Sequence, residues 1–203
     1  MLICLEYFGC AVGAISGVLA ATGKRLDLFG ALVLALVTAV GGGTIRDLCL
    51  GIKPVFWVED PGYVMVATAA ALGTFVVARF WRMPYKSLMV ADAFGLALFT
   101  IIGLEKSLLY DSSTFIAVML GIVTGVAGGL LRDVLRGEIP LVLQPEIYLY
   151  ATAAFAGAVV YVLLLQWLPG VWFARYIGMT VILALRLAAI LWKLRLPVFE
   201  PRK

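Results

Sequence analysis

The chain is dominated by apolar runs that are each long enough to cross a lipid bilayer. A transmembrane helix needs about 20 mainly apolar residues. Seven runs meet this length, and they are Leu2–Ala21, Leu28–Leu48, Gly62–Phe80, Leu88–Leu104, Thr114–Leu135, Ile147–Trp167 and Val171–Trp192. Polar or turn residues separate most of them, and Leu168-Pro169-Gly170 divides the last two. The pattern predicts an all-α integral membrane protein with seven transmembrane helices.

The composition supports this prediction. Hydrophobic residues make up 64% of the 203 residues and charged residues only 14%, which leaves too little polar surface for a soluble domain. The chain contains no histidine, and it lacks nucleophile, nucleotide-binding and metal-ligand motifs. We therefore expect no enzyme activity, no catalytic residue, no metal site and no cofactor. The net charge of +4 is interpreted as membrane topology and not as nucleic-acid binding.

The distribution of Lys and Arg predicts the orientation. With seven spans, eleven basic residues fall on the side of the C-terminus and four on the opposite side. Cytoplasmic loops are enriched in Lys and Arg. We therefore expect the N-terminus outside and the C-terminus in the cytoplasm.

The sequence repeats itself at a spacing of 86 residues, the distance from Thr38 to Thr124. Thr38–Pro54 reads TAVGGGTIRDLCLGIKP, and Thr124–Pro140 reads TGVAGGLLRDVLRGEIP. The same spacing pairs Glu6 with Asp92. The repeated units cover about residues 2–81 and 88–167, with a seventh helix at about 171–193, all in one transmembrane domain, 1–203.

Each repeated unit contains three spans, which is an odd number. The second copy must therefore enter the membrane from the side opposite to the first. The two copies are then related by a pseudo-twofold axis in the membrane plane, as in many transporters. A duplication with only a structural role is the alternative interpretation.

Glycines mark the middle of the repeated motif. Gly41, Gly42 and Gly43 have Gly128 and Gly129 as counterparts in the second copy. One small residue suffices for close helix packing, whereas consecutive glycines weaken a helix by about 1 kcal/mol each. We therefore predict a kink or break in the second and fifth helices, beside protein or a water-filled cavity.

Charged residues follow the glycines within the spans. Arg46 and Asp47 come after the first glycine group, and Arg132 and Asp133 come after the second. Ionised groups inside a membrane pair with each other or face water, and adjacent helical residues point about 100° apart. We therefore expect partners on other helices and a role in lining or gating a pathway; anchoring of helix ends is the alternative.

Two further charges lie within predicted spans. Asp92 lies four residues into its run and is a candidate partner for Arg or Lys. Arg186 lies among apolar residues of the seventh run. We expect Arg186 either to face a subunit contact or to extend to the inner surface, and the sequence does not distinguish these possibilities.

The doubled GGG-x-x-RD and GG-x-x-RD motif, the two inverted triplets with a seventh helix, and LPVF at Leu196–Phe199 resemble the bacterial members of the trimeric intracellular cation (TRIC) channel family. The domain of this family is also called a glycine transporter. The resemblance spans nearly the whole chain. It implies a homotrimer in the inner membrane, surrounded by lipid, in which each subunit has its own potassium-permeable pore and kinked second and fifth helices.

The leading hypothesis is therefore a monovalent-cation channel. A secondary transporter for a small solute such as glycine is the alternative, because inverted repeats with broken helices also occur in transporters. The sequence lacks the TVGYG filter of potassium-selective channels.

Overall fold

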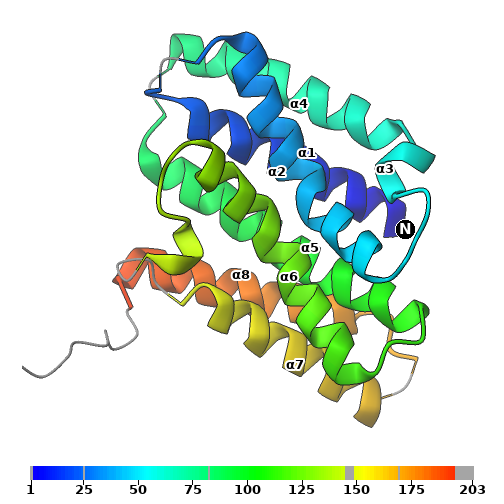
Figure 1. Ribbon diagram of the computed structural model, residues 1–203. Helices are drawn as coiled ribbons and strands as arrows, with labels where there is room; N and C mark the ends of the chain where they lie inside the picture. The colour runs from blue at the N-terminus through cyan, green and yellow to red at the C-terminus, as the bar shows by residue number, and fades with distance from the viewer. Residues whose placement is uncertain (1, 25, 82, 145–148, 169, 195–203) are drawn as a thin grey trace, which may run out of the picture.

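The computed structural model describes residues 2–194 except 25, 82, 145–148 and 169, and it is entirely helical within this part of the chain. Figure 1 shows long helices running side by side. Their bounds are α1 Leu2–Ala21, α2 Leu28–Cys49, α4 Gly62–Phe80, α5 Tyr85–Leu109, α6 Thr114–Leu135, α7 Ala151–Trp167 and α8 Ala174–Trp192. Two short helices lie between them, α3 Phe56–Glu59 and the 3₁₀-helix η1 Leu141–Leu143.

The predicted membrane spans agree closely with these helices. Among the described residues, six helices are long and apolar enough to cross a membrane, and α7 is a shorter apolar helix of 17 residues. The predicted sixth span began at residue 147, which lies outside the described residues, as does the LPVF segment. The fourth span was predicted too short, because α5 extends over 25 residues and carries polar residues at both of its ends.

Two loops end the repeated helices in the same way. Gly51 follows α2 with a φ of 70°, and Gly137 follows α6 with a φ of 69°. This left-handed conformation suits glycine and closes a Schellman motif. The N–H of Ile52 donates to the carbonyl of Asp47, and the N–H of Glu138 donates to the carbonyl of Asp133. The spacing of 86 residues therefore holds in the backbone as well as in the sequence.

Equivalent helices of the two repeats run in opposite directions through the bundle. The first repeat contains α1, α2 and α4, and lies above the second, which contains α5, α6 and α7 (Figure 1). Contacts between the repeats are extensive for α2 with α6 and for α1 with α5, while α8 packs against α5 and α7. This arrangement confirms the prediction of an inverted repeat with one additional helix.

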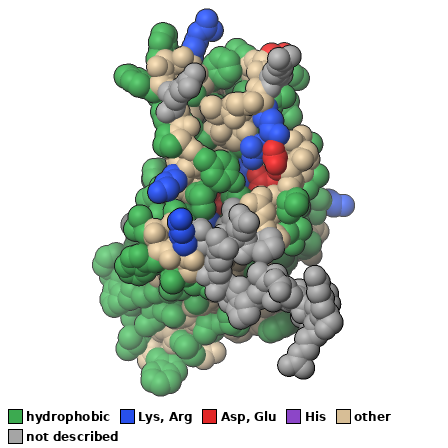
Figure 2. All heavy atoms as spheres, turned by 90° about the vertical axis from the view of Figure 1, so that its left-hand side faces the viewer, with side chains coloured by type: hydrophobic (Ala, Val, Ile, Leu, Met, Phe, Trp, Pro, Cys, Tyr) green, Lys and Arg blue, Asp and Glu red, His purple; other side chains and the backbone are tan. Residues whose placement is uncertain are grey.

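The bundle has two ends, which we name after a lysine on each. The Lys24 end carries the α1–α2 and α4–α5 connections and the end of α8, and it lies on the left in Figure 1; the Lys106 end lies on the right. Figure 2 looks onto the Lys24 end, where Lys and Arg side chains lie among hydrophobic surface.

Large aromatic side chains are exposed near both ends. Phe80, Trp81 and Trp192 lie near the Lys24 end, and Trp167 and Trp172 lie near the Lys106 end. Aromatic rings gather at the two interfaces between lipid and water. The two groups of rings therefore mark where the bilayer would meet the protein.

Candidate functional site

A small cavity, which we call the central cavity, lies where the two repeats meet. Its volume is about 20 Å³, and its walls come from α1, α2, α5 and α6. A cavity of this size holds roughly one water molecule. Its polar side chains are those of Ser16, Thr38, Asp92 and Thr124, and glycines supply much of the remaining surface.

The glycines of the cavity place the α2 and α6 backbones in contact. A Cβ atom on Gly42 would lie 2.0 Å from the carbonyl oxygen of Thr124, and one on Gly128 would lie 2.4 Å from the carbonyl oxygen of Thr38. Gly42 and Gly128 are counterparts in the repeat, as are Thr38 and Thr124. The contact is therefore reciprocal about the pseudo-twofold axis.

No full break occurs at these glycines, because α2 and α6 run uninterrupted through Gly41–Gly43 and Gly128-Gly129, and a kink there stays a prediction. The prediction assumed that packing would use one glycine of the group, but each faces a different neighbour. A Cβ on Gly41 would lie 2.8 Å from Leu131, and one on Gly43 would lie 2.6 Å from the Phe56 ring. The glycine groups therefore serve close packing on several sides.

Arg132 is the centre of a buried charge cluster near the Lys24 end. Its Nη1 donates to Asp92 Oδ1 at 2.9 Å, and its Nε donates to Asp133 Oδ1 at 2.8 Å. The hydroxyl of Ser16 is a further partner of Nη1. Arg132 is fully buried, so these partners replace the water that an exposed guanidinium would bind. The expected pairing of Asp92 with a basic residue is present.

Arg46 occupies the equivalent position near the Lys106 end. Its Nε donates to Asp47 Oδ1 at 2.8 Å, and Lys106 Nζ lies 3.5 Å from the same oxygen. The guanidinium lies 5.7 Å from the centre of the Phe56 ring. Both motif arginines thus bind the aspartate next to them, whereas the angle between adjacent positions led us to expect partners on other helices. The long arginine side chain turns back far enough to overcome the angle between neighbouring positions.

Both motif aspartates also hold the segment that follows their helix. Asp47 Oδ2 accepts the backbone N–H of Phe56 at 2.9 Å, and Asp133 Oδ2 accepts the backbone N–H of Leu141 at 2.9 Å. These bonds position α3 at one end and η1 at the other. Neither short helix was predicted from the sequence.

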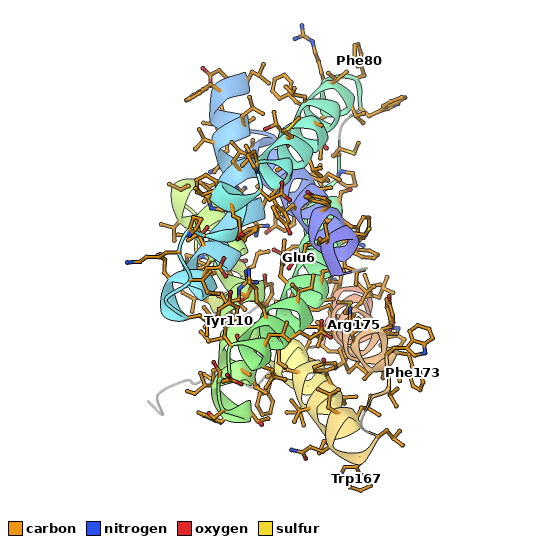
Figure 3. All side chains as sticks on the ribbon, turned by 90° about the vertical axis from the view of Figure 1, so that its right-hand side faces the viewer. Glu6, Phe80, Tyr110, Trp167, Phe173 and Arg175 are labelled. Carbon is orange, nitrogen blue, oxygen red and sulfur yellow. The ribbon has the colours of Figure 1, made fainter. Side chains whose placement is uncertain are left out.

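The counterpart of Asp92 in the first repeat is Glu6, which accepts a hydrogen bond from the hydroxyl of Tyr63. Figure 3 looks onto the Lys106 end, where Glu6 lies near the middle of the bundle while Phe173 and Trp167 lie at its edge. Among the described residues, Glu6 forms no ion pair. The two repeats therefore treat equivalent carboxylates differently.

Arg186 on α8 joins the cluster around Asp92. Its Nη2 lies 3.9 Å from Asp92 Oδ2, and its Cζ lies 4.5 Å from the centre of the Tyr150 ring. The side chain is fully buried within one subunit, so both predicted locations, a subunit contact and the inner surface, are wrong. Position in the sequence does not reveal which face of α8 meets α5.

A second buried carboxylate connects α8 to the bundle near the Lys106 end. Glu105 of α5 accepts a hydrogen bond from the Tyr161 hydroxyl at 2.8 Å, and Arg175 Nε lies 3.2 Å from the same oxygen. These three side chains lie away from the central cavity. None of them was selected from the sequence, because neither Glu105 nor Arg175 belongs to the repeated motif.

Two carboxylates outside the spans also have ionic or hydroxyl partners. Lys24 pairs with Glu138 and holds the pKa of that carboxyl below its usual value. The hydrogen bond from the Tyr7 hydroxyl lowers the pKa of Asp60 in the same way, together with a bond from the Gly62 N–H. The Lys24–Glu138 pair joins the two repeats at the Lys24 end.

Sequence comparisons place the chain among bacterial membrane proteins. A family model described as a glycine transporter matches residues 3–79 and 89–166. The UPF0126 inner membrane protein YadS of Escherichia coli K12 is 48% identical over 96% of this chain and 94% of its own length. A UPF0126 membrane protein of Vibrio cholerae is 45% identical over 100% of this chain and 84% of its own length.

The chain is also similar to solved structures over nearly its whole length. A TRIC trimeric intracellular cation channel orthologue from Rhodobacter sphaeroides has a TM-score of 0.89 at 40% identity, covering 95% of this chain and 98% of that chain. A second structure, from a study of conductance through TRIC cation channels, has a TM-score of 0.86 at 35% identity, covering 98% of this chain and 97% of that chain.

Proposed function

Because this chain belongs to the TRIC channel family, we propose that it is a monovalent-cation channel, permeable to potassium, with one pore in each subunit of a homotrimer. The observation that carries the proposal is the similarity to a TRIC channel over 95% of the chain, at 40% identity and a TM-score of 0.89. The similarity to ion channels also agrees with the expectation that the protein is not an enzyme.

The central cavity supports a pathway inside the subunit. It lies between the repeats and is lined by hydroxyl groups, a carboxylate and glycine backbone, which are groups that can replace part of the water around a cation. At about 20 Å³, it corresponds to a closed pathway that must widen before ions pass. We place α2 and α6 along this pathway, with Gly42, Gly43, Gly128 and Gly129 in its wall.

The motif charges would act at the two ends of this pathway. Arg132 with Asp92 and Asp133 lies near the Lys24 end, and Arg46 with Asp47 lies near the Lys106 end. An unpaired arginine on the path of a cation would repel it. Paired with carboxylates, the same arginines have part of their charge offset at each end of the pathway.

The excess of Lys and Arg residues on the side of the C-terminus supports an orientation with the Lys24 end in the cytoplasm. The C-terminus is then cytoplasmic and the N-terminus outside, in a multi-pass protein of the cell membrane. A reporter fused to the C-terminus should be active only in the cytoplasm. Activity only in the periplasm would overturn this orientation.

Single-channel recording tests the proposed function. Purified protein in a planar bilayer should give discrete unitary currents in KCl, with a reversal potential that follows the potassium gradient. The family description as a glycine transporter favours a carrier as the second candidate. Absence of unitary currents together with glycine uptake into proteoliposomes would replace the channel with that carrier.

A further inference from the structure

A second cavity lies at the Lys24 end, where α1, α2 and α4 meet (Figure 1). We call it the α4 cavity. Its volume is about 230 Å³, against about 20 Å³ for the central cavity, and the two cavities share no lining residue. Two basic side chains and an apolar wall line it, and they are Lys24, Arg79, Val18, Leu26, Phe75 and Ala78. No acidic residue is among the described residues of its lining.

The basic side chains of the α4 cavity can still bind an anion. Arg79 is exposed, and its side chain forms no ion pair with any residue that the structure describes. Lys24 pairs with Glu138, but an ammonium group has three donors and this pair uses one. The nearby carboxylate of Asp27 accepts the N–H of Gly30 and does not line the cavity.

Arg79 lies at the depth of the lipid headgroups. The next two residues, Phe80 and Trp81, expose 74% and 68% of their surface, and such aromatic rings gather where lipid meets water. Basic pockets between transmembrane helices bind the headgroups of anionic lipids. A guanidinium suits this task, because it can donate two parallel hydrogen bonds to one phosphate group.

An apolar stripe on α4 continues from the cavity toward the middle of the membrane. Leu72, Phe75, Val76 and Arg79 are three or four residues apart and therefore share one face of the helix. Leu72 and Val76 are exposed on this face. At 1.5 Å per residue, Leu72 lies about 10 Å deeper than Arg79. An acyl chain whose phosphate lies at Arg79 can follow this stripe into the bilayer.

We propose that the α4 cavity is a binding site for an anionic phospholipid. Arg79 and Lys24 hold its phosphate, and an acyl chain lies against Phe75 and the stripe below it. A free phosphate ion has the same charged group, but it would leave the apolar wall of the cavity unused. This inference does not depend on ion conduction, because it requires only that the Lys24 end lies at a membrane surface.

The test measures lipid binding to the purified protein in detergent by native mass spectrometry, with phosphatidylglycerol and phosphatidylcholine as probes. The parent should bind phosphatidylglycerol more tightly than phosphatidylcholine. Arg79→Gln should weaken the binding of phosphatidylglycerol about fivefold, which corresponds to about 1 kcal/mol for one basic residue at the membrane surface. The binding of phosphatidylcholine, which has no net charge, should change less. Arg79 is the better position for this test, because replacing Lys24 would also break its pair with Glu138.

Matched variants separate the cavity from the general charge of the surface. Lys193→Gln removes an exposed positive charge that follows α8 at the same end of the bundle and does not line the cavity. It should leave the affinity for phosphatidylglycerol unchanged. Ala78→Leu places a larger side chain in the cavity wall and should weaken the binding of both lipids. Inorganic phosphate at the concentration of the lipid should not displace phosphatidylglycerol.

Three results would overturn the proposal. Equal weakening by Arg79→Gln and Lys193→Gln would indicate attraction to the whole basic surface. Unchanged affinity for phosphatidylglycerol in both Arg79→Gln and Ala78→Leu would place the lipid elsewhere. Displacement of the lipid by inorganic phosphate would identify a site for phosphate alone.

Discussion

At the scale of single residues, the three glycines of α2 at its crossing with α6 each pack against a different neighbour. Gly41, Gly42 and Gly43 face a leucine, a backbone carbonyl and an aromatic ring, respectively. A helix that has close neighbours on three sides needs a small residue on each of them. The weak helix propensity of the triplet is offset because neighbouring helices hold it in place.

We predict that Gly42→Ala destabilises the protein by about 1–3 kcal/mol or more, because the added methyl group meets the α6 backbone and not a flexible side chain. Gly128→Ala should behave alike, since it meets the carbonyl of Thr38. Thermal unfolding in detergent measures both effects.

Gly73→Ala is the matched control for these two variants. Gly73 lies on α4, where an added Cβ meets nothing within 4 Å. Because alanine favours a helix by about 1 kcal/mol over glycine, the control should unfold at an equal or higher temperature than the parent. If all three variants unfold alike, the α2–α6 crossing is not the tight contact described above.

Prediction from the sequence was least successful for residues whose partners lie on another element. The pairing of Asp92 with a basic residue followed from the cost of a lone charge in the membrane. The place of Arg186 did not follow, since the sequence does not show which helices the Arg186 face of α8 meets. Ser16, Tyr63 and Tyr150 carry no local signal at all, because their roles depend only on what the fold brings beside them.

At the scale of helices and loops, the apolar runs were sufficient to locate the long helices. Several predicted spans, including Leu2–Ala21 and Gly62–Phe80, match the observed helices at both ends. The short α3 and η1 escaped prediction because a bond from a distant aspartate fixes each of them. The length and apolar composition of a run predict whether it can cross a membrane. They contain no information about such hydrogen bonds between distant residues.

The loop pair Lys24–Glu138 gives a prediction about pH. The pKa of Glu138 is lowered from 4.5 in the folded protein, so its contribution to stability is complete above that value and is lost as the pH falls through the lower folded pKa. Glu138→Gln should therefore lower the unfolding temperature at pH 7, and the difference from the parent should shrink as the pH falls below 4.5.

Lys24→Gln is the control for this pH effect, because it removes the same pair from the other side. Both variants should lose the same part of the pH dependence of the unfolding temperature. High salt should reduce the difference at pH 7, since the pair is exposed to solvent. A difference between Glu138→Gln and the parent that persists unchanged at pH 3 would contradict an ionic role.

On the scale of the whole molecule, the proposed trimer with three separate pores makes a quantitative prediction. Thr38 lines the central cavity, and Thr38→Cys would allow a thiol reagent to block one pore. In mixed trimers of known composition, whose exposed Cys4 and Cys49 are replaced by serine, each Thr38→Cys subunit should remove about one third of the current.

The parent trimer without Cys4 and Cys49 is the control and should be insensitive to the reagent, because Cys10 is buried. Complete block by a single modified subunit would indicate one shared pore on the threefold axis. Block in steps, in proportion to the number of modified subunits, supports a pathway within each subunit.

The reciprocal contact between Gly42 and Thr124 and between Gly128 and Thr38 has a consequence for the history of the chain. A contact in which each half offers the same surface to the other is one that two identical chains can form. The crossing thus has the geometry that two copies of a single three-helix protein, inserted into the membrane in opposite orientations, would need in order to dimerise. Gene fusion would then only have joined partners already in contact.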